Sequence, residues 1–258
     1  MNNVAISRSQ KFLRKFWYIF WRFIERRFFQ GKVYTLQIPY GHRLFTPWFE
    51  KNPNSEFSEI LSMVKDSGPL IVSPDRCYIL YQLVKRASLL PGDFAECGVY
   101  SGGTAYLLVS VLAKYISYNK KLHLFDTFTG MPETSFPSRD YHSPGDFADT
   151  SIDIVKKRLN LYDSFCIFHV GVMPDTFSEV KDIKKFSFVH IDVDIFPSVQ
   201  ACCEFFYPRL SRGGVIVFDD YGFYPYRNSV RAAVDCYFSN KNDKPLILPI
   251  GQAVIIKI

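Results

Sequence analysis

The sequences 189-VHIDVD-194 and 215-VIVFDDY-221 each place two aspartates directly after a short apolar run that is typical of a buried strand. The carboxylates are Asp192 and Asp194 in the first stretch, and Asp219 and Asp220 in the second. In an open parallel sheet, the carboxyl ends of the strands form the crevice in which ligands bind. Four carboxylates at that edge predict a site for a hard cation or for proton transfer, the alternative being solvated turns and helix caps.

Outward from these stretches, short apolar runs alternate with longer amphipathic segments over residues 91–245. Strands are predicted over 94–99, 122–126, 165–170, 186–192 and 215–219, and helices over 104–118, 147–161, 177–184, 198–210 and 227–239. Residues 246–250 and 253–258 flank a tight turn at Gly251 and Gln252, which predicts a terminal antiparallel hairpin. The pattern therefore predicts an α/β fold with a doubly wound, mostly parallel seven-stranded sheet that ends in this hairpin.

A glycine-rich turn, 96-ECGVYSGG-103, follows the first predicted strand and opens a helix. Gly98 allows a close turn there, and Gly102 and Gly103 let a ligand approach the backbone near the helix N-terminus. The spacing is not GxGxxG, which favours an adenosine ligand without phosphates over a dinucleotide. Asp126 ends the second strand, where an acidic side chain typically accepts hydrogen bonds from ribose hydroxyls.

The bulk composition limits the classes of function. With 258 residues, 48% of them hydrophobic, the chain is long enough to bury a large core. The formal net charge of +6 comes entirely from residues 1–32, which hold eight Lys or Arg residues against the single Glu25, so that the rest of the chain is nearly neutral. A body without basic stripes argues against nucleic acid as a substrate. Six cysteines without CxxC spacing predict a reducing, cytoplasmic location and no zinc site.

The chain before the sheet divides into two parts. Residues 1–32 hold a basic, aromatic segment (8–32) with roughly helical spacing and no apolar run long enough to span a bilayer. Two interpretations stay open: an interfacial helix that makes a peripheral membrane contact, or a helix that packs on the body or on a second subunit of a homo-oligomer. Residues 33–90 are predicted to form a cap that is partly irregular and partly helical. Its helix is expected to begin with Ser73 as N-cap and Pro74 at the first helical position. Residues 91–258 form the third predicted unit.

Several motifs, in this order, carry a resemblance to a known family. They are 96-ECGVYSGG-103, 125-FDTFTGMP-132, 171-GVMPDTF-177, 190-HIDVDIF-196 and 210-LSRGGVIVFDDY-221. From residue 90 to residue 258 the chain resembles the macrocin O-methyltransferase family, a branch of the class I S-adenosylmethionine-dependent methyltransferases with a Rossmann-like sheet. The family often has Glu-Gly-Leu-Pro where this chain has 129-TGMP-132, a difference that leaves the identity of the acceptor open.

The resemblance implies a role for each candidate residue. It implies that S-adenosylmethionine is held by Glu96, Gly98, Tyr100, Ser101, Gly102, Asp126 and Thr127. It also implies that Asp192, Asp219 and Asp220 bind Mg²⁺ or another hard cation, and that Asp194 is the catalytic base. Oxygen ligands alone suit Mg²⁺ better than zinc.

These expectations predict a magnesium-assisted O-methyltransferase that acts on a hydroxyl of a sugar or of a glycosylated small molecule. The cation would bind two vicinal hydroxyls of the acceptor, lower the pKa of one and align it with the methyl group, while Asp194 takes its proton. Two alternatives are an O-methyltransferase of catechol-like or other diols, and a non-catalytic, membrane-associated protein that binds the cofactor. Activity on aromatic diols would indicate the first, and cofactor binding without methyl transfer would indicate the second.

Overall fold

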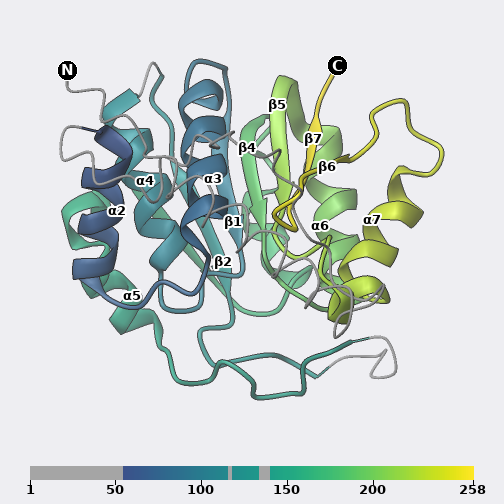
Figure 1. The fold of residues 1–258 in the computed structure, drawn as a ribbon, viewed down its shortest axis with the longest axis horizontal. Helices are drawn as coiled ribbons and strands as arrows, with labels where there is room; N and C mark the ends of the chain where they lie inside the picture. The colour runs from purple at the N-terminus through teal and green to yellow at the C-terminus, as the bar shows by residue number, and fades with distance from the viewer. Residues whose placement is uncertain (1–54, 116–117, 134–139) are drawn as a thin grey trace, which may run out of the picture. The chain divides into compact units, whose positions relative to one another are not determined.

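The computed structural model describes residues 55–115, 118–133 and 140–258, all within one compact unit of the chain that spans Pro47–Ile258. Figure 1 shows this unit as a twisted sheet with helices on both of its faces. The predicted N-terminal helix over 1–32 and the beginning of the predicted cap, residues 33–54, lie outside the described residues. Among the described residues, no helix has the length and apolar content that crossing a bilayer requires.

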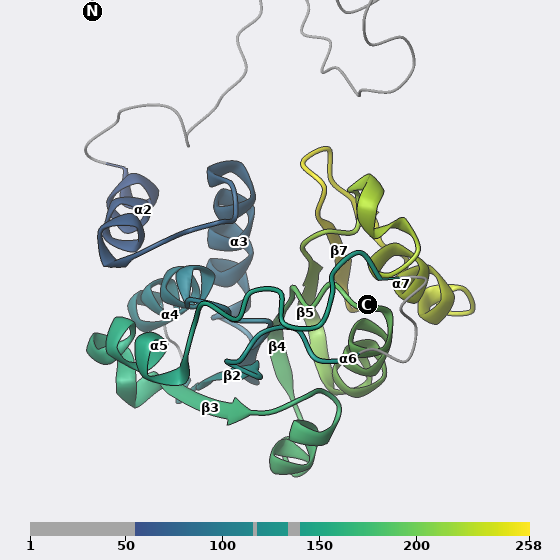
Figure 2. The same cartoon turned by 90° about the horizontal axis from the view of Figure 1, so that it is seen from below.

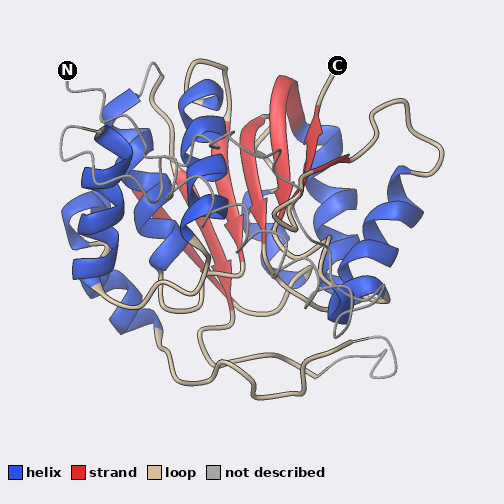
Figure 3. Ribbon diagram, in the orientation of Figure 1, coloured by secondary structure: helices blue, strands red, loops and turns tan. Residues whose placement is uncertain are grey.

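The sheet has seven strands in the order β3-β2-β1-β4-β5-β7-β6, drawn in red in Figure 3. Neighbours from β3 to β5 pair in parallel, whereas β7 runs antiparallel to both β5 and β6. Their bounds are β1 (Asp93–Cys97), β2 (Leu122–Asp126), β3 (Cys166–Val170), β4 (Phe186–Ile191), β5 (Leu210–Phe218), β6 (Leu246–Ile247) and β7 (Ala253–Ile256). The predicted fold class, including the terminal antiparallel hairpin, is confirmed.

The helices along the sheet alternate with its strands, as crossover connections between parallel strands require. Their bounds are α2 (Glu56–Ser67), α3 (Pro74–Ala87), α4 (Gly103–Tyr115), α5 (Ile152–Arg158), α6 (Phe196–Arg209) and α7 (Val230–Phe238), with short 3₁₀ helices η1 (Asn160–Phe165), η2 (Asp175–Val180) and η3 (Tyr224–Arg227). The helix predicted over 177–184 is only the short η2, and that over 147–161 is divided between α5 and η1. Helix α2 lies in a stretch that the sequence pattern left irregular.

Side-chain alternation along the strands builds two cores, one on each face of the sheet. Phe94, Leu124, Phe188 and Val217 point to the face that α2, α3 and α4 cover. Their neighbours in the chain, among them Phe125, point to the face that α6 and α7 cover. Figure 2 shows α2, α3, α4 and α5 on one side of the strands and α6 on the other. Continuous burial of β4, with no exposed position, fits a central strand that is covered on both faces.

Helix α3 brings its first turn over the carboxyl ends of the central strands. Ser73 is its N-cap residue and Pro74 opens it, as predicted, although the Ser73 side chain makes no capping bond to the helix backbone. Instead, Ser73 Oγ accepts a hydrogen bond from Nε of Arg76 at 3.2 Å. The start of α3 therefore fixes the position of a cationic side chain beside the end of β5.

Candidate functional site

A cavity of about 310 Å³ lies at the carboxyl ends of the parallel strands. It collects segments that are far apart in the sequence: the turn after β1, the end of β2, the turn after β4 and the end of β5. Its lining includes Gly98, Val99, Tyr100, Ser101, Gly103, Asp126, Thr127, Asp192, Asp194, Asp219, Asp220, Arg76 and Tyr226. Most of the residues predicted to form a site are thus brought to one place, because parallel strands end at the same edge of the sheet.

The glycine-rich turn passes close to the backbone of the turn after β4. Gly98 has a φ of +85°, and a Cβ atom at this position would overlap the carbonyl oxygen of Asp192. Only glycine satisfies both conditions without strain. Tyr100 also has a positive φ of 48°, which costs more for a residue with a side chain. The turn therefore holds its backbone in a fixed, strained shape against the cavity.

Asp126 fixes this turn to the end of β2. Its Oδ2 accepts hydrogen bonds from the amides of Val99 at 2.7 Å and Tyr100 at 2.9 Å, and its Oδ1 accepts one from the amide of Phe128 at 2.7 Å. Charge-assisted bonds of this kind are stronger than neutral ones. Asp126 still lines the cavity, so the same carboxylate shapes the turn and faces the space where a ligand would lie.

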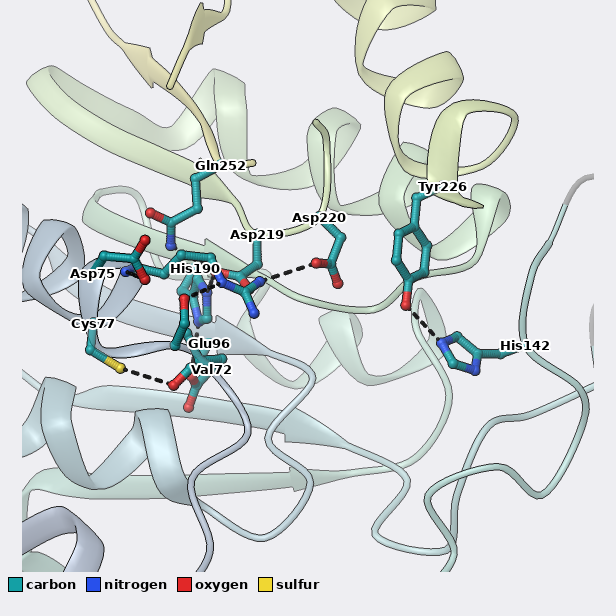
Figure 4. Close-up of polar contacts among 12 residues, drawn as sticks. Val72, Asp75, Cys77, Glu96, His142, His190, Asp219, Asp220, Tyr226 and Gln252 are labelled. Atoms are coloured by element: carbon teal, nitrogen blue, oxygen red, sulfur yellow. Dashed lines mark hydrogen bonds and ion pairs between the residues drawn. The ribbon is translucent and has the colours of Figure 1, made fainter. Parts of the chain in front are cut away.

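A row of polar side chains crosses the sheet beneath α3. Glu96 on β1 pairs in register with His190 on β4, which places both on the same face, and Oε1 of Glu96 lies 2.9 Å from Nδ1 of His190. Nε2 of His190 lies 3.4 Å from Oδ1 of Asp219, which also accepts a hydrogen bond from Nε2 of Gln252 at 2.7 Å. Figure 4 shows Glu96, His190, Asp219 and Gln252 in this arrangement.

Two buried groups of this row, His190 and Asp219, have shifted pKa values. Burial alone would lower the pKa of His190, but the bonds to Asp219 and Glu96 outweigh it and raise that pKa to about 10. For Asp219 the effects are reversed: burial alone would raise its pKa. The hydrogen bond and charge of His190, together with the charge of Arg76, outweigh burial, so the pKa of Asp219 is lowered. The raised pKa of His190 favours the imidazolium form, which lies in contact with Glu96 and Asp219.

Arg76 provides the second cation of the site. Its Nη1 donates to Oδ2 of Asp219 and lies 3.1 Å from Oδ1 of Asp220. The guanidinium also lies 5.2 Å from the centre of the Phe223 ring. Arg76 was not among the residues predicted from the sequence, because nothing in the pattern of α3 indicates carboxylate partners in a strand so distant along the chain.

Three carboxylates are left with too little positive charge. Oxygen atoms of Asp192, Asp194 and Asp220 lie within 4.8 Å of one another, and a second such group joins His190, Asp192 and Asp219. Burial is the main cause that raises the pKa of both Asp192 and Asp194, and the repulsion of the neighbouring carboxylates raises it further. Oδ1 of Asp194 is buried without a hydrogen-bond partner. Carboxylate oxygens grouped in this way fit a hard divalent cation, and the orphaned Oδ1 of Asp194 is available to a further partner.

The local backbone explains how Asp192 and Asp194 meet. Residues two apart point the same way only while a strand continues, and β4 ends at Ile191. Asp194 has a φ of +57°, in the left-handed region, so a turn rather than a strand returns its carboxylate toward that of Asp192. This conformation costs of order 1 kcal/mol or more for a residue with a side chain, and such strain often accompanies function.

The loop between β2 and α5 covers one side of the cavity. His142 on this loop has Nε2 3.0 Å from the hydroxyl of Tyr226, a contact drawn in Figure 4. The same nitrogen lies 3.6 Å from Oδ2 of Asp194. Its Nδ1 lies 3.0 Å from Asp146. Further along the loop, Asp149 accepts a hydrogen bond from the hydroxyl of Tyr100 at 2.9 Å. Residues 134–139, at the middle of the loop and including Arg139, lie outside the described residues.

Two predicted cofactor residues do not line the cavity. Glu96 is wholly buried against His190, because alternation along β1 turns its side chain under α3. Gly102 is likewise absent from the lining, although its φ of +80° shapes the turn. Of the tyrosines that follow the second acid pair, Tyr226 lines the cavity, whereas Tyr221 is buried and bonded to Asp235 and Tyr224 is exposed.

Comparison with known proteins gives a family match and several relatives. A family model described as macrocin-O-methyltransferase matches residues 78–253. The chain is 27% identical over 150 residues to the 8-demethyl-8-(2,3-dimethoxy-alpha-L-rhamnosyl)-tetracenomycin-C 4'-O-methyltransferase of Streptomyces olivaceus. The matched region covers 55% of this chain and 57% of that protein. The chain is also 27% identical over 143 residues to the mycinamicin III 3''-O-methyltransferase of Micromonospora griseorubida, with 51% and 56% covered. The chain thus spans little more than half the length of these curated relatives.

A solved structure supports the fold. The O-methyltransferase NovP superposes with a TM-score of 0.66 at 22% identity, over 74% of this chain and 82% of NovP. The mixed seven-stranded sheet, mostly parallel with antiparallel end strands, matches the class I methyltransferase fold.

Proposed function

The chain belongs to the macrocin O-methyltransferase family, and on this premise we propose that it transfers the methyl group of S-adenosylmethionine to a hydroxyl of a sugar or of a glycosylated small molecule. The observation that carries the proposal is the meeting of Asp192, Asp194 and Asp220 beside the glycine-rich turn in one cavity. The relatives from Streptomyces and Micromonospora are named for O-methylation of glycosylated compounds, which supports this class of acceptor. The free cysteine thiols fit a reducing compartment such as the cytoplasm.

In this proposal the turn after β1 and the end of β2 hold the methyl donor. Gly98, Tyr100, Ser101, Asp126 and Thr127 line the same cavity as the acid cluster. Asp126 keeps the turn in shape and accepts from the ribose hydroxyls, as acidic residues at this position of doubly wound folds do. Gly102 supports the turn through its backbone, and Glu96 acts from behind the cavity by holding His190.

Mg²⁺ or another hard cation belongs in this proposal among Asp192, Asp219 and Asp220. When bound, the ion would lower the pKa of an acceptor hydroxyl, and S-adenosylmethionine would supply an electrophilic methyl group. Asp192 and Asp220 offer carboxylate oxygens that face the cavity. Asp219 has one oxygen engaged by His190 and Gln252, so it reaches a cation only with the oxygen that Arg76 contacts.

Asp194 is the proposed base. Its raised pKa, caused by burial and by the repulsion of Asp220, makes its carboxylate a stronger proton acceptor than an exposed aspartate. The free Oδ1 atom can take the proton of an acceptor hydroxyl, while Oδ2 stays near His142. Tyr226 and His142 close the cavity on this side and exclude water from the reacting hydroxyl.

The test combines binding and turnover on the full chain. We expect the wild-type protein to bind S-adenosylhomocysteine in calorimetry and to transfer a labelled methyl group to a glycosylated acceptor with vicinal hydroxyls, in a manner that EDTA suppresses. Asp194→Asn should retain S-adenosylhomocysteine affinity and lose turnover by a factor of about 100 or more, the usual range for a general base. Asp153→Asn, at an exposed position of α5, serves as the control.

Each contrary outcome has a defined meaning. Near wild-type turnover in Asp194→Asn would remove the base assignment. Methyl transfer only to aromatic diols would move the acceptor to the catechol-like class. Tight binding of S-adenosylhomocysteine without transfer to any diol would contradict an enzymatic role.

A further inference from the structure

We propose that Arg76 is a built-in counter-ion of the acid cluster, and that a divalent cation binds Asp219 and Asp220 only by displacing the Arg76 guanidinium from them. This inference rests on the metal site of the proposed function and adds a residue that controls it. Arg76 acts on the site through two carboxylates, so its role is that of a positioning residue.

The first support is where the guanidinium lies. A single nitrogen, Nη1, contacts Oδ2 of Asp219 and lies 3.1 Å from Oδ1 of Asp220. For Asp219 this is the oxygen left for a cation, since its other oxygen is bonded to Gln252 and faces His190. Arginine and metal would therefore compete for Oδ2 of Asp219, and the same guanidinium lies next to the Asp220 carboxylate.

The second support is how firmly Arg76 is held. Its Nε donates to Ser73 at the start of α3, and its guanidinium lies over the Phe223 ring in the segment after β5. The side chains of Arg76 and Asp220 are 14% and 15% exposed, and that of Asp219 is 1% exposed. Low solvent access strengthens the attraction between these charges, so the arginine is a real competitor rather than a mobile surface group.

The third support is the unequal hold on the two aspartates. Asp219 is fixed by His190 and Gln252 as well as by Arg76. Asp220 is more exposed and lies with Asp192 and Asp194 in the oxygen cluster. We therefore expect Asp220 to exchange partners first, from the guanidinium to the cation, while Asp219 keeps its contacts across the sheet.

The experiment measures Mn²⁺ binding to the full chain after treatment with EDTA, by calorimetry, in four proteins. They are the wild type, Arg76→Gln, Arg76→Lys and the control Arg86→Gln, which removes one positive charge from the exposed end of the same helix. Removing a positive charge next to the site should tighten Mn²⁺ binding by about tenfold or more in Arg76→Gln. Arg76→Lys should bind about two- to fivefold tighter than wild type, because its ammonium is a compact charge that cannot reproduce the planar fork. Arg86→Gln should match the wild type.

Thermal unfolding gives an independent readout. Without metal, Arg76→Gln should melt at a lower temperature than the wild type, because its carboxylates have lost their cation. Saturating Mn²⁺ should raise its melting temperature by more than it raises that of the wild type. If Arg76→Gln does not fold, Arg76→Lys carries both measurements.

The outcomes separate this inference from the proposed function. Mn²⁺ affinity that is unchanged or weaker in folded Arg76→Gln or Arg76→Lys, while the wild type binds Mn²⁺, overturns the counter-ion role and leaves the methyltransferase proposal standing. Mn²⁺ binding that appears only in the Arg76 variants supports the counter-ion role. Binding in none of the proteins overturns both the counter-ion role and the metal site, and failure to bind S-adenosylhomocysteine counts against the proposed function alone.

Discussion

Nδ1 of His190 lies 2.9 Å from Oε1 of Glu96, and both side chains are wholly buried. The parallel register that pairs these residues on β4 and β1 makes this contact, and α3 covers it. The same imidazole faces Asp219, so one buried cation links the strand before the glycine-rich turn to the strand that carries the second acid pair. The polar row thereby connects the two halves of the cavity.

Replacing His190 should be strongly destabilising. His190→Gln leaves Glu96 buried without a cation and leaves Asp219 with Arg76 as its cationic partner. Losing one partner of a buried ion pair costs about 3–5 kcal/mol. We expect that loss in the free energy of unfolding, measured with urea. Glu179, which contacts His169 and is about half exposed, offers the comparison. Glu179→Gln should lower the free energy of unfolding by about 1 kcal/mol or less. In the double variant His190→Gln/Glu96→Gln, a loss of unfolding free energy equal to the sum of the two single losses would contradict an energetic coupling between His190 and Glu96.

Asp126 should control both the donor site and the shape of the turn. Asp126→Ala removes the acceptor for the amides of Val99 and Tyr100, and we expect S-adenosylhomocysteine affinity to fall by about tenfold or more, since each lost charged hydrogen bond is worth 1.5–3 kcal/mol. Calorimetry measures this directly. Asp126→Asn keeps one carbonyl oxygen, so its affinity for S-adenosylhomocysteine should lie between those of the wild type and Asp126→Ala. Wild-type affinity in Asp126→Ala would exclude a role for this carboxylate in binding the donor.

Two adjacent lysines should differ sharply in their contribution to stability. Nζ of Lys120 is buried and donates to the carbonyl oxygens of Leu90 and Gly92 and to Ser187. Nζ of Lys121 donates to the carbonyl oxygen of Ser164 at an exposed position. Lys120→Met should lower the free energy of unfolding by about 2–4 kcal/mol, because buried carbonyls lose their donor. Lys121→Met should lower it by about 1 kcal/mol or less. Equal losses would show that burial of the amine does not matter.

His169 should make the protein less stable in mild acid. Burial, only partly offset by the bond to Glu179, lowers the pKa of His169. Below the unfolded value of about 6.5 the unfolded chain therefore takes up a proton that the folded chain does not, and stability falls as the pH falls. His169→Phe keeps the stacking on Phe125 but cannot titrate. We expect urea unfolding at a series of pH values to show a shallower loss below about pH 6.5 in this variant. An identical slope in both proteins would assign the acid sensitivity to other groups.

The sequence alone predicted the order of strands and helices along the body of the fold. Alternating apolar runs and amphipathic segments are local patterns, and the five parallel strands and the terminal hairpin follow from them. The patterns failed where tertiary contacts replace periodicity. Helix α2 was not predicted, and the helix expected over 177–184 is the short η2.

The local sequence pattern indicates which carboxylates can meet, because residues that end parallel strands must lie at one edge of the sheet. Asp126, Asp192, Asp194, Asp219 and Asp220 all line the cavity for this reason. The partner of each carboxylate depends instead on how the strands and helices pack. Register and side-chain alternation turned Glu96 toward His190 instead of the cavity, and the docking of α3 placed Arg76 on Asp219 and Asp220. Contacts between residues so far apart in the chain depend on how whole elements pack, which no local pattern of residues encodes.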